Sequence, residues 1–191
     1  MSKVVVAITG ASGAAIGIRV FERLLARPDT APQLIVSPSA RRTIAHEVGP
    51  AALERLLLTG ATLHEHDDIG ATLASGSYPT AGMIVAPCSM RTLAAIAAGL
   101  ADNLIVRAAD VHLKERRRLV LVAREAPLHL GHLRNMVAVT EMGAIVMPPV
   151  PAFYHRPQTV ADIVDHLASR AIDLLALPGP REALAWDGGE A

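Results

Sequence analysis

The feature that most constrains the fold is a short apolar run followed by a glycine turn and a helical pattern. Residues 4–9 are rich in β-branched side chains and end at Gly10, as expected of a strand buried on both faces. Ile16, Val20 and Leu24 then recur at helical spacing, which predicts a helix over residues 13–26. A strand inside a sheet, covered by the helix that follows it, is therefore expected at the start of the chain.

The same alternation continues along the chain. Further strands are predicted at residues 33–36, 83–86, 119–123 and 144–147, and further helices at residues 40–47, 51–58, 90–98, 103–116, 129–142 and 159–176. Strands separated by helices predict a Rossmann-like, doubly wound parallel sheet in a three-layer α/β/α domain. Residues 64–80 and 147–158 break the pattern and are predicted to be functional loops.

The chain is expected to form a single domain over residues 1–177, with a surface tail at 178–191 for which docking on a neighbouring subunit and a frayed terminus are both open. Its 191 residues include only 3% aromatic side chains and carry a formal net charge of +0. This composition argues against a nucleic-acid binder. The start lacks the features of a signal peptide, and no apolar run approaches the roughly 20 residues that span a bilayer, so a cytoplasmic protein is predicted.

Candidate ligand-binding residues follow the first strand, because ligands of doubly wound sheets bind beyond the carboxyl ends of the strands. The stretch TGASGAAIG, residues 9–17, combines glycines with a helix start whose amides suit an anion, and Ser12 adds a hydroxyl. A plain tight turn is the alternative interpretation. The glycine spacing is not GxGxxG, and no acidic residue follows the second strand to bind a ribose. A mononucleotide phosphate is therefore favoured over NAD.

Hydroxyl side chains follow two further predicted strands. Ser37 precedes a predicted helix, and is interpreted equally well as a helix cap or as a ligand contact. The stretch PCSMRT, residues 87–92, places Ser89 and Thr92 at another helix start, which predicts a second cradle for an anion or a polar ring. Cys88, the only cysteine, is interpreted as a small packed thiol.

Several charged residues occupy positions where a charge needs a partner. Arg124 and Glu125 end an apolar strand, and Arg170 interrupts the apolar stripe of the last predicted helix. Arg107 and Lys114 share one helical face with Asp110 between them, for which a solvated ion-pair network is the alternative. The partner of Arg170 is either a carboxylate of a packed helix or a ligand phosphate. The histidine pairs lack the carboxylates or thiols that would complete a metal site, so none is predicted.

Four stretches together resemble the flavin prenyltransferase family, the UbiX and phenylacrylic acid decarboxylase-like proteins. They are TGASGAAIG, ASGSYPTAGMIVAPCSMRTL, RAADVHLKERRRLVLVAREAPLHLGHLRNM and MGAIVMPPVPAFYHRPQTV, and they cover nearly the whole chain in order. The resemblance implies a metal-independent transferase that moves a dimethylallyl group from dimethylallyl phosphate to reduced FMN. Attack by N5 of the flavin is followed by ring closure at C6, and the prenylated FMN serves a UbiD-type decarboxylase.

The resemblance also implies roles for individual residues. Those matching the FMN contacts are Gly10, Ala11, Ser12, Ser37, Ser89, Met90, Arg91, Thr92, Arg107 and Arg124. Those matching the contacts to dimethylallyl phosphate are Lys114, Tyr154 and Arg170, and the candidate catalytic residues are Glu125, Glu47, Lys114, Arg124 and Ser12. Glu125 is expected to position or transfer a proton, although the departing phosphate is an alternative base.

The family further implies a homo-oligomer, commonly a dodecamer, with sites shared between subunits. Three positions depart from the common family pattern, namely Ile16, Pro38 and Ile69, so local flavin and prenyl contacts are expected to differ there. Two alternatives were weighed. A cysteine-type FMN-dependent decarboxylase of the same fold is disfavoured because its asparagine-rich substrate clamp is absent, and in a non-catalytic flavin carrier Arg124, Glu125 and Arg170 would form structural ion pairs.

Overall fold

The computed structural model describes residues 1–186 and 188. Within this part of the chain the strands are β1 (Ser2–Ile8), β2 (Thr30–Val36), β3 (Thr62–His64), β4 (Gly82–Cys88), β5 (Leu119–Ala123) and β6 (Ile145–Val146). The helices are α1 (Ala14–Ala26), α2 (Pro38–Glu47), α3 (Ala52–Leu57), α4 (Met90–Ala98), α5 (Leu104–Lys114), α6 (Leu130–Glu141) and α7 (Val160–Asp173), with 3-10 turns η1 (Thr72–Ala74) and η2 (Phe153–His155).

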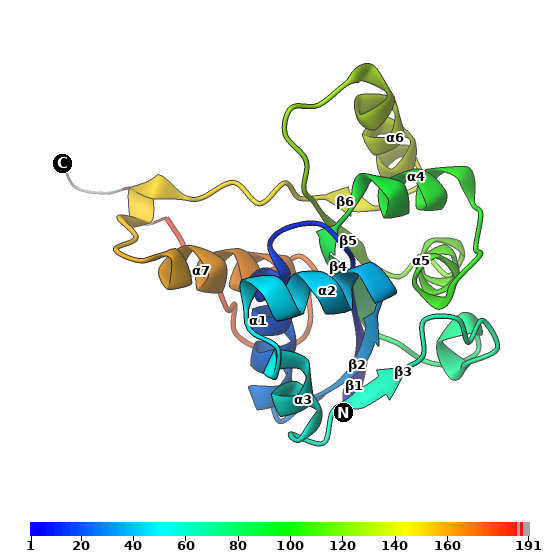
Figure 1. The fold of residues 1–191 in the computed structure, drawn as a ribbon, viewed down its shortest axis with the longest axis horizontal. Coiled ribbons are helices and arrows are strands. Elements are labelled where there is room, and N and C mark those ends of the chain that lie inside the picture. The colour runs from blue at the N-terminus through cyan, green and yellow to red at the C-terminus, as the bar shows by residue number, and fades with distance from the viewer. Residues whose placement is uncertain (187, 189–191) are drawn as a thin grey trace.

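The strands form one parallel sheet in the order β3-β2-β1-β4-β5-β6 (Figure 1). The predicted doubly wound parallel sheet is therefore confirmed. The chain winds outward in one direction through β2 and β3 and in the other through β4, β5 and β6. The order reverses between β1 and β4, and a crevice at such a switch point is where ligands of this architecture bind.

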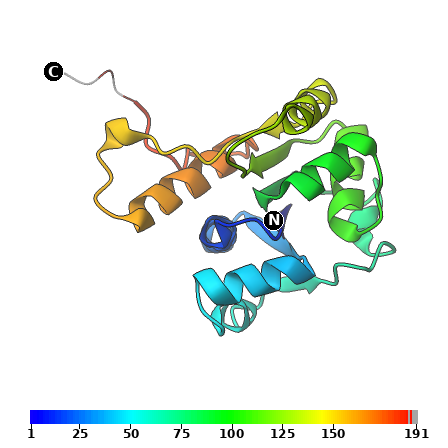
Figure 2. The ribbon, with the colours of Figure 1, turned by 45° about the horizontal axis from the view of Figure 1, so that its top comes forward.

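Helices cover both faces of the sheet because side chains of a buried strand alternate between its faces. On β1, Val4, Val6 and Ile8 belong to a core shared with α1, α2, α3 and α7. Val5 and Ala7 belong to a second core shared with α4, α5 and α6. Figure 2 shows these two helical layers with the sheet between them. The predicted three-layer arrangement is thus confirmed.

The glycine turn after β1 is shaped by two conformational demands. Gly13 adopts φ 101° at the N-cap of α1, a left-handed backbone conformation that favours glycine. Gly17 lets α1 lie against β4, because a Cβ atom there would come 2.0 Å from the carbonyl oxygen of Ala86. The turn therefore fixes where α1 begins and how closely it approaches the sheet.

The structure adds an edge strand that was not predicted and shortens the last predicted helix. The three-residue edge strand β3 begins before the predicted loop 64–80 and was not expected, because so short a segment carries no periodic signal. Its register is held by backbone pairing to β2 and by a 2.9 Å contact between His64 Nε2 and Gln33 Oε1. The last helix was predicted over residues 159–176 but ends at Asp173. None of the helices within residues 1–186 and 188 is long and apolar enough to cross a membrane.

The tail after α7 lies against its own protomer as far as it is described. The guanidinium of Arg27 donates to the carbonyl of Pro178 at 2.7 Å, and the amide of Glu182 donates to Asp173 at 2.7 Å. Residues 187 and 189–191 of the predicted tail lie outside the described residues. Docking of the tail on a neighbouring subunit therefore stays a prediction.

Candidate active site

The carboxyl ends of β1, β4 and β5 are joined directly by hydrogen bonds. The Thr9 hydroxyl donates to the Pro87 carbonyl at 2.7 Å and accepts from the Ser89 amide at 2.8 Å. The Arg124 amide donates to the Cys88 carbonyl at 3.1 Å. These bonds bring the glycine turn, the start of α4 and the Arg124–Glu125 pair to one edge of the sheet, as the sequence predicted. Residues from three strands thus border the switch point, where ligands of this architecture bind, and we refer to this edge of the sheet as the crevice.

Glu47 closes one side of this crevice by capping α1 from the end of α2. Its carboxylate accepts from the amides of Gly13 and Ala14, each at 2.9 Å. Burial raises the pKa of the Glu47 carboxyl, but hydrogen bonds from Ser12, Ala14 and Gly13 and the charge of Arg124 outweigh it, so the pKa is lowered. Glu47 is therefore ionised at neutral pH and lies close enough to Arg124 to interact electrostatically.

This cap corrects one expectation about the glycine turn. The amides at the start of α1 were expected to be open to an anion, but two of them already donate to a carboxylate. A second anion beside Glu47 would be repelled. The turn residues Gly10, Ala11 and Ser12 still lie at the crevice edge between β1 and α1, where they remain candidates for contacts to other parts of a flavin.

The start of α4 offers a second helix N-terminus without such a carboxylate. Ser89 is its N-cap, and the Ser89 side chain accepts from the Thr92 amide at 3.3 Å and donates to the Thr92 hydroxyl at 3.1 Å. The amides of Met90 and Arg91 lie in the first turn, where a helix has no internal acceptor for them. Helix N-termini of this kind bind phosphate groups. The predicted second cradle therefore fits a mononucleotide phosphate.

The remaining predicted flavin contacts are Ser37 at the start of α2, Arg91 in the first turn of α4 and Arg107 on α5. Ser37 caps α2 by accepting from the Ala40 amide at 3.1 Å, so its capping interpretation is confirmed, and its ligand role stays a prediction. The Arg91 side chain is exposed and binds Asp102 at 2.8 Å. Arg107 binds Asp110 at 2.7 Å on α5, which agrees with the alternative of an ion pair on that face, and its contact with the flavin stays a prediction.

Arg124 and Glu125 directly follow β5 and form only a long ion pair with each other. The closest charged atoms, Arg124 Nη1 and Glu125 Oε1, are 3.9 Å apart, and both side chains are partly exposed. Glu125 also accepts from the Ala126 amide at 3.1 Å. Since neither group is saturated by protein partners, both retain hydrogen-bonding capacity for a ligand.

Lys114 is placed away from this crevice within one protomer. It ends α5 and binds Glu115, on the side of the sheet where β5 begins at Leu119. Arg124 follows the opposite end of β5. Five residues of strand separate the two ends, a span of roughly 16 Å. One chain therefore does not bring Lys114 and Arg124 together.

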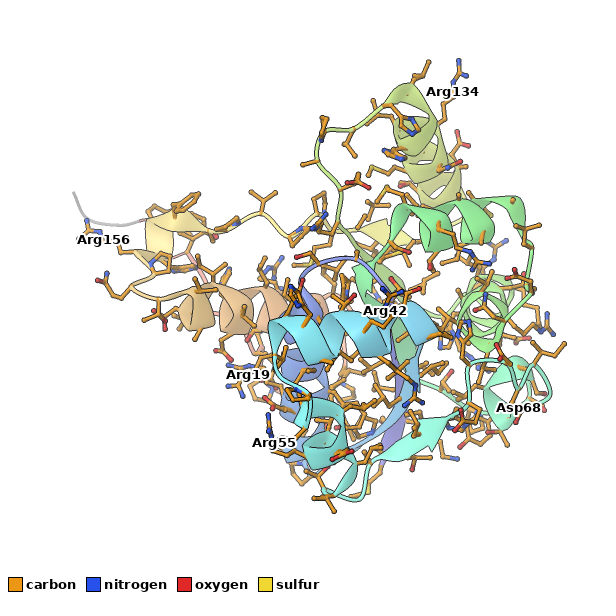
Figure 3. The ribbon with its side chains drawn as sticks, viewed as in Figure 1. Arg19, Arg42, Arg55, Asp68, Arg134 and Arg156 are labelled. Carbon is orange, nitrogen blue, oxygen red and sulfur yellow. The ribbon has the colours of Figure 1, made fainter. Side chains whose placement is uncertain are left out.

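Tyr154 and Arg170 lie on the α7 side of the molecule. Tyr154 belongs to η2, where it packs edge-on against Trp186 with ring centroids 5.2 Å apart. Arg170 Nη1 lies 3.7 Å from Asp173 of the same helix. Arg156, which directly follows η2, lies at one end of the molecule in Figure 3, far from Arg134 on α6. The contact between Trp186 and Tyr154 was missed from the sequence, although Trp186 is the only tryptophan of the chain.

The Cys88 thiol and the His129 imidazole each have a structural role in the fold. Burial raises the pKa of the Cys88 thiol to about 12, as expected of a packed side chain rather than a nucleophile. His129 caps α6 by accepting from the amides of Gly131 and His132. Among residues 1–186 and 188, no group of three or more histidine, cysteine, aspartate or glutamate side chains is arranged to hold a metal ion.

Comparison with known proteins agrees with this geometry. The family model described as "Flavoprotein" matches residues 1–172. A probable UbiX-like flavin prenyltransferase of Streptomyces sp. (strain D7) is 50% identical over 189 residues, which cover 99% of this chain and 94% of the relative. The crystal structure of AnUbiX (PadA1) in complex with FMN and dimethylallyl pyrophosphate matches with a TM-score of 0.90 and 46% identity, covering 99% of both chains.

A dodecameric FMN-dependent Ubix-like decarboxylase from Escherichia coli O157:H7 also matches with a TM-score of 0.90 and 46% identity, over 97% of this chain and 99% of that one. The cysteine decarboxylase TvaF from thioviridamide biosynthesis shares only 14% identity at a TM-score of 0.65, so that likeness shows the fold alone. With 50% identity to a UbiX-like relative over almost the full length, the chain belongs to the Flavoprotein family and, within it, to the UbiX-type flavin prenyltransferases, which are transferases.

Proposed function

We propose that this enzyme transfers a dimethylallyl group from dimethylallyl phosphate to reduced FMN. The observation that carries the proposal is the set of hydrogen bonds that joins Thr9, Ser89 and Arg124 at the switch point of the sheet. It gathers the glycine turn, the start of α4 and a pair of opposite charges at one edge of the sheet, which supports a flavin site there. Reduced FMN supplies the N5 and C6 positions that accept the dimethylallyl group.

The start of α4 is proposed to hold the FMN phosphate. Ser89 and Thr92 orient the first turn, and no carboxylate in the described part of the chain accepts a hydrogen bond from the amides of Met90 and Arg91, which suits an anion there. Gly10, Ala11, Ser12 and Ser37 border the same edge from β1 and β2 and are proposed to contact the rest of the flavin. The absence of a side chain at Gly10 lets the turn pass Ser39 closely.

Cations and a phenol are proposed to stabilise the leaving phosphate. Arg124 comes from the crevice itself, whereas Lys114, Tyr154 and Arg170 lie elsewhere on the protomer. A preorganised cation stabilises the transition state only if it lies beside the group on which negative charge develops, here the leaving phosphate. These side chains must therefore converge on one phosphate. A homo-oligomer, of the dodecameric size recorded for the Escherichia coli O157:H7 relative, is proposed to bring them together from neighbouring subunits.

Proton transfer is assigned to Glu125, with Glu47 in a supporting role. Ring closure at C6 requires loss of a proton, and Glu125 has a carboxylate oxygen available beside Arg124. The low pKa of Glu47 keeps it ionised, so it orders Ser12 and the α1 start rather than donating a proton. The released phosphate is the alternative base.

The product is proposed to pass to a UbiD-type decarboxylase in the cytoplasm. The sole cysteine, Cys88, is unpaired and buried, which suits a reducing compartment. A pull-down of the two proteins under anaerobic conditions, followed by recovery of decarboxylase activity, tests the transfer. No recovery on mixing the two purified proteins would argue against this recipient.

The central experiment is anaerobic incubation of the purified protein with reduced FMN and dimethylallyl phosphate. Release of phosphate together with a gain in flavin mass equal to one dimethylallyl group is expected, and an unchanged flavin would refute the function. Parallel reactions with dimethylallyl pyrophosphate compare the two donors, because the similar AnUbiX structure contains the pyrophosphate.

Glu125→Gln tests the assigned role in proton transfer. The variant should bind FMN as the parent does and form product at least about a hundredfold more slowly, the range of a lost acid–base group. Glu54→Gln, an exposed change on α3, serves as the control. Full activity of Glu125→Gln would remove Glu125 from the mechanism.

A further inference from the structure

The C-terminal tail is fastened to α1 by a carboxylate that bridges two arginines. Glu182 Oε2 accepts from Arg23 Nη1 at 2.8 Å, and Glu182 Oε1 accepts from Arg27 Nη1 at 2.9 Å. The three side chains are largely shielded from solvent, with the Glu182 side chain 18% exposed. Charge-assisted bonds of this kind are stronger than neutral ones. Glu182 therefore anchors the tail between two successive turns of α1.

The same segment is also held by α7. The carboxylate of Asp173 accepts from the amides of Glu182 and Ala183, at 2.7 and 3.2 Å. The Asp173 side chain is only 6% exposed. The backbone on both sides of Glu182 is thus oriented by α7, while its side chain is clamped by α1. We refer to residues 178–183, with these contacts, as the tail latch.

Beyond the latch, the tail places Trp186 on Tyr154. The two rings pack edge-on with centroids 5.2 Å apart, and Tyr154 also lies 4.3 Å from the ring of His155. No residue of η2 is buried, so this turn has no core packing of its own to position the phenol. The contact with Trp186 is therefore one of the few constraints on Tyr154.

The latch limits how far Trp186 can move. Trp186 lies four residues after Glu182 and nine after Leu177, the partly buried residue where the tail leaves the core. The effective concentration of a flexibly tethered group falls roughly as the 3/2 power of the length of its tether. Shortening the free tether of Trp186 from nine residues to four thus raises its local concentration at Tyr154 by up to about threefold.

We propose that Glu182 is a positioning residue for the transferase reaction, acting through Trp186 to hold Tyr154 in place for the dimethylallyl phosphate. This role rests on the proposed function, in which Tyr154 contacts the phosphate. Glu182 itself touches neither substrate. Its contribution is to keep the phenol preordered, so that the cost of ordering it is not incurred when the phosphate binds.

Glu182→Gln tests this role, because the amide loses the charge and one of the two acceptor oxygens. The KM for dimethylallyl phosphate should rise by up to about threefold, whereas the dissociation constant for FMN should stay unchanged. Since Trp186 is the only tryptophan, its fluorescence reports directly on the tail, and quenching by acrylamide should increase. Glu22→Gln is the matched control, because Glu22 lies on α1 and pairs with exposed Arg19 but not with the tail.

A double-mutant cycle separates positioning from general stabilisation. Trp186→Ala should raise the same KM, and adding Glu182→Gln to it should give little further increase, because both act through one contact. Unchanged KM and quenching in Glu182→Gln, additive effects in the cycle, or equal losses of FMN and donor affinity would each overturn the positioning role. If the parent enzyme itself forms no prenylated flavin, the proposed function falls and this role with it. An active parent with a normal Glu182→Gln variant refutes the latch alone.

Discussion

Asp165 joins the two helices that carry opposite parts of the candidate site. Its carboxylate on α7 accepts from Arg19 Nε at 2.6 Å and from Arg23 Nε and Nη2 at 2.8 and 2.5 Å, all on α1. The hydrogen bonds from Arg23 lower the pKa of Asp165 to about 2, with burial opposing them and Arg19 adding to them. Asp165→Asn should therefore loosen the contact between α1, which begins at the crevice, and α7, which carries Arg170.

The expected cost follows from that pKa. A fall from 3.8 to about 2 corresponds to at most about 2.4 kcal/mol at 1.36 kcal/mol per pKa unit. The Asp165 side chain is 36% exposed, so solvent screening reduces the expected loss to about 1 kcal/mol. For a chain of this size that loss lowers Tm by roughly 2–4 °C.

The pH dependence has a definite sign. Because the pKa of Asp165 is lower in the folded state, its stabilisation is fully present above the unfolded value near 3.8 and is lost as pH falls toward about 2. The free energies of unfolding of Asp165→Asn and the parent, measured in urea, should differ by about 1 kcal/mol at pH 7. This difference should shrink progressively below pH 4. Protomer concentration must be kept constant, since association contributes to apparent stability.

Glu54→Gln provides the control for this experiment. Glu54 is an exposed carboxylate on α3 that makes no ion pair with other residues in the described part of the chain. Its removal should leave the free energy of unfolding within about 0.5 kcal/mol. Equal stability of Asp165→Asn and the parent at pH 7 would refute the conclusion that Asp165 stabilises the contact between α1 and α7. A difference in stability that persists undiminished at the lowest pH would also refute it.

Three further outcomes are expected. Arg170→Ala should raise the KM for dimethylallyl phosphate about tenfold or more, with FMN affinity unchanged, in steady-state and flavin-binding assays; equal losses would indicate a purely structural role. Gly17→Ala should destabilise the fold by at least about 1–3 kcal/mol in urea titration, because the added Cβ meets the Ala86 carbonyl at 2.0 Å; an unchanged midpoint would contradict this packing. Cys88 should resist a disulfide reagent at pH 8 until urea unfolds the protein, because burial raises its thiol pKa to about 12; rapid labelling of the native protein would show otherwise.

The elements of the fold that could be predicted are those whose local patterns agree with their burial. The strand at residues 119–123 is an uninterrupted apolar run buried on both faces, and β5 has the same bounds. The predicted strand at residues 144–147 shrinks to Ile145–Val146, because this edge strand pairs with β5 alone. Edge strands receive fewer backbone partners, so their lengths depend on tertiary pairing that a local pattern does not contain.

The site was predictable where it depends on strand order and not where it depends on distant partners. Ser89 and Arg124 follow strands that lie side by side, so topology alone brings them to one edge of the sheet. Arg23 and Glu182 are far apart along the chain, and neither stands in a recognisable motif. Nothing local indicates that one would anchor the other. The ion pairs of the tail therefore could be found only from the folded chain.

Two helix starts illustrate how the structure refines a prediction that local signals leave open. Both α1 and α4 follow a strand of the central sheet and offer first-turn amides, so both are candidate phosphate sites by sequence. The choice depends on Glu47, a residue at the end of another helix. Its carboxylate accepts from the amides at the start of α1 and so places a negative charge there. Like charges repel, so a phosphate is favoured at α4, where Ser89 and Thr92 supply neutral hydroxyls. A remote carboxylate thus gives the start of α1 a structural role and leaves the start of α4 as the candidate phosphate site.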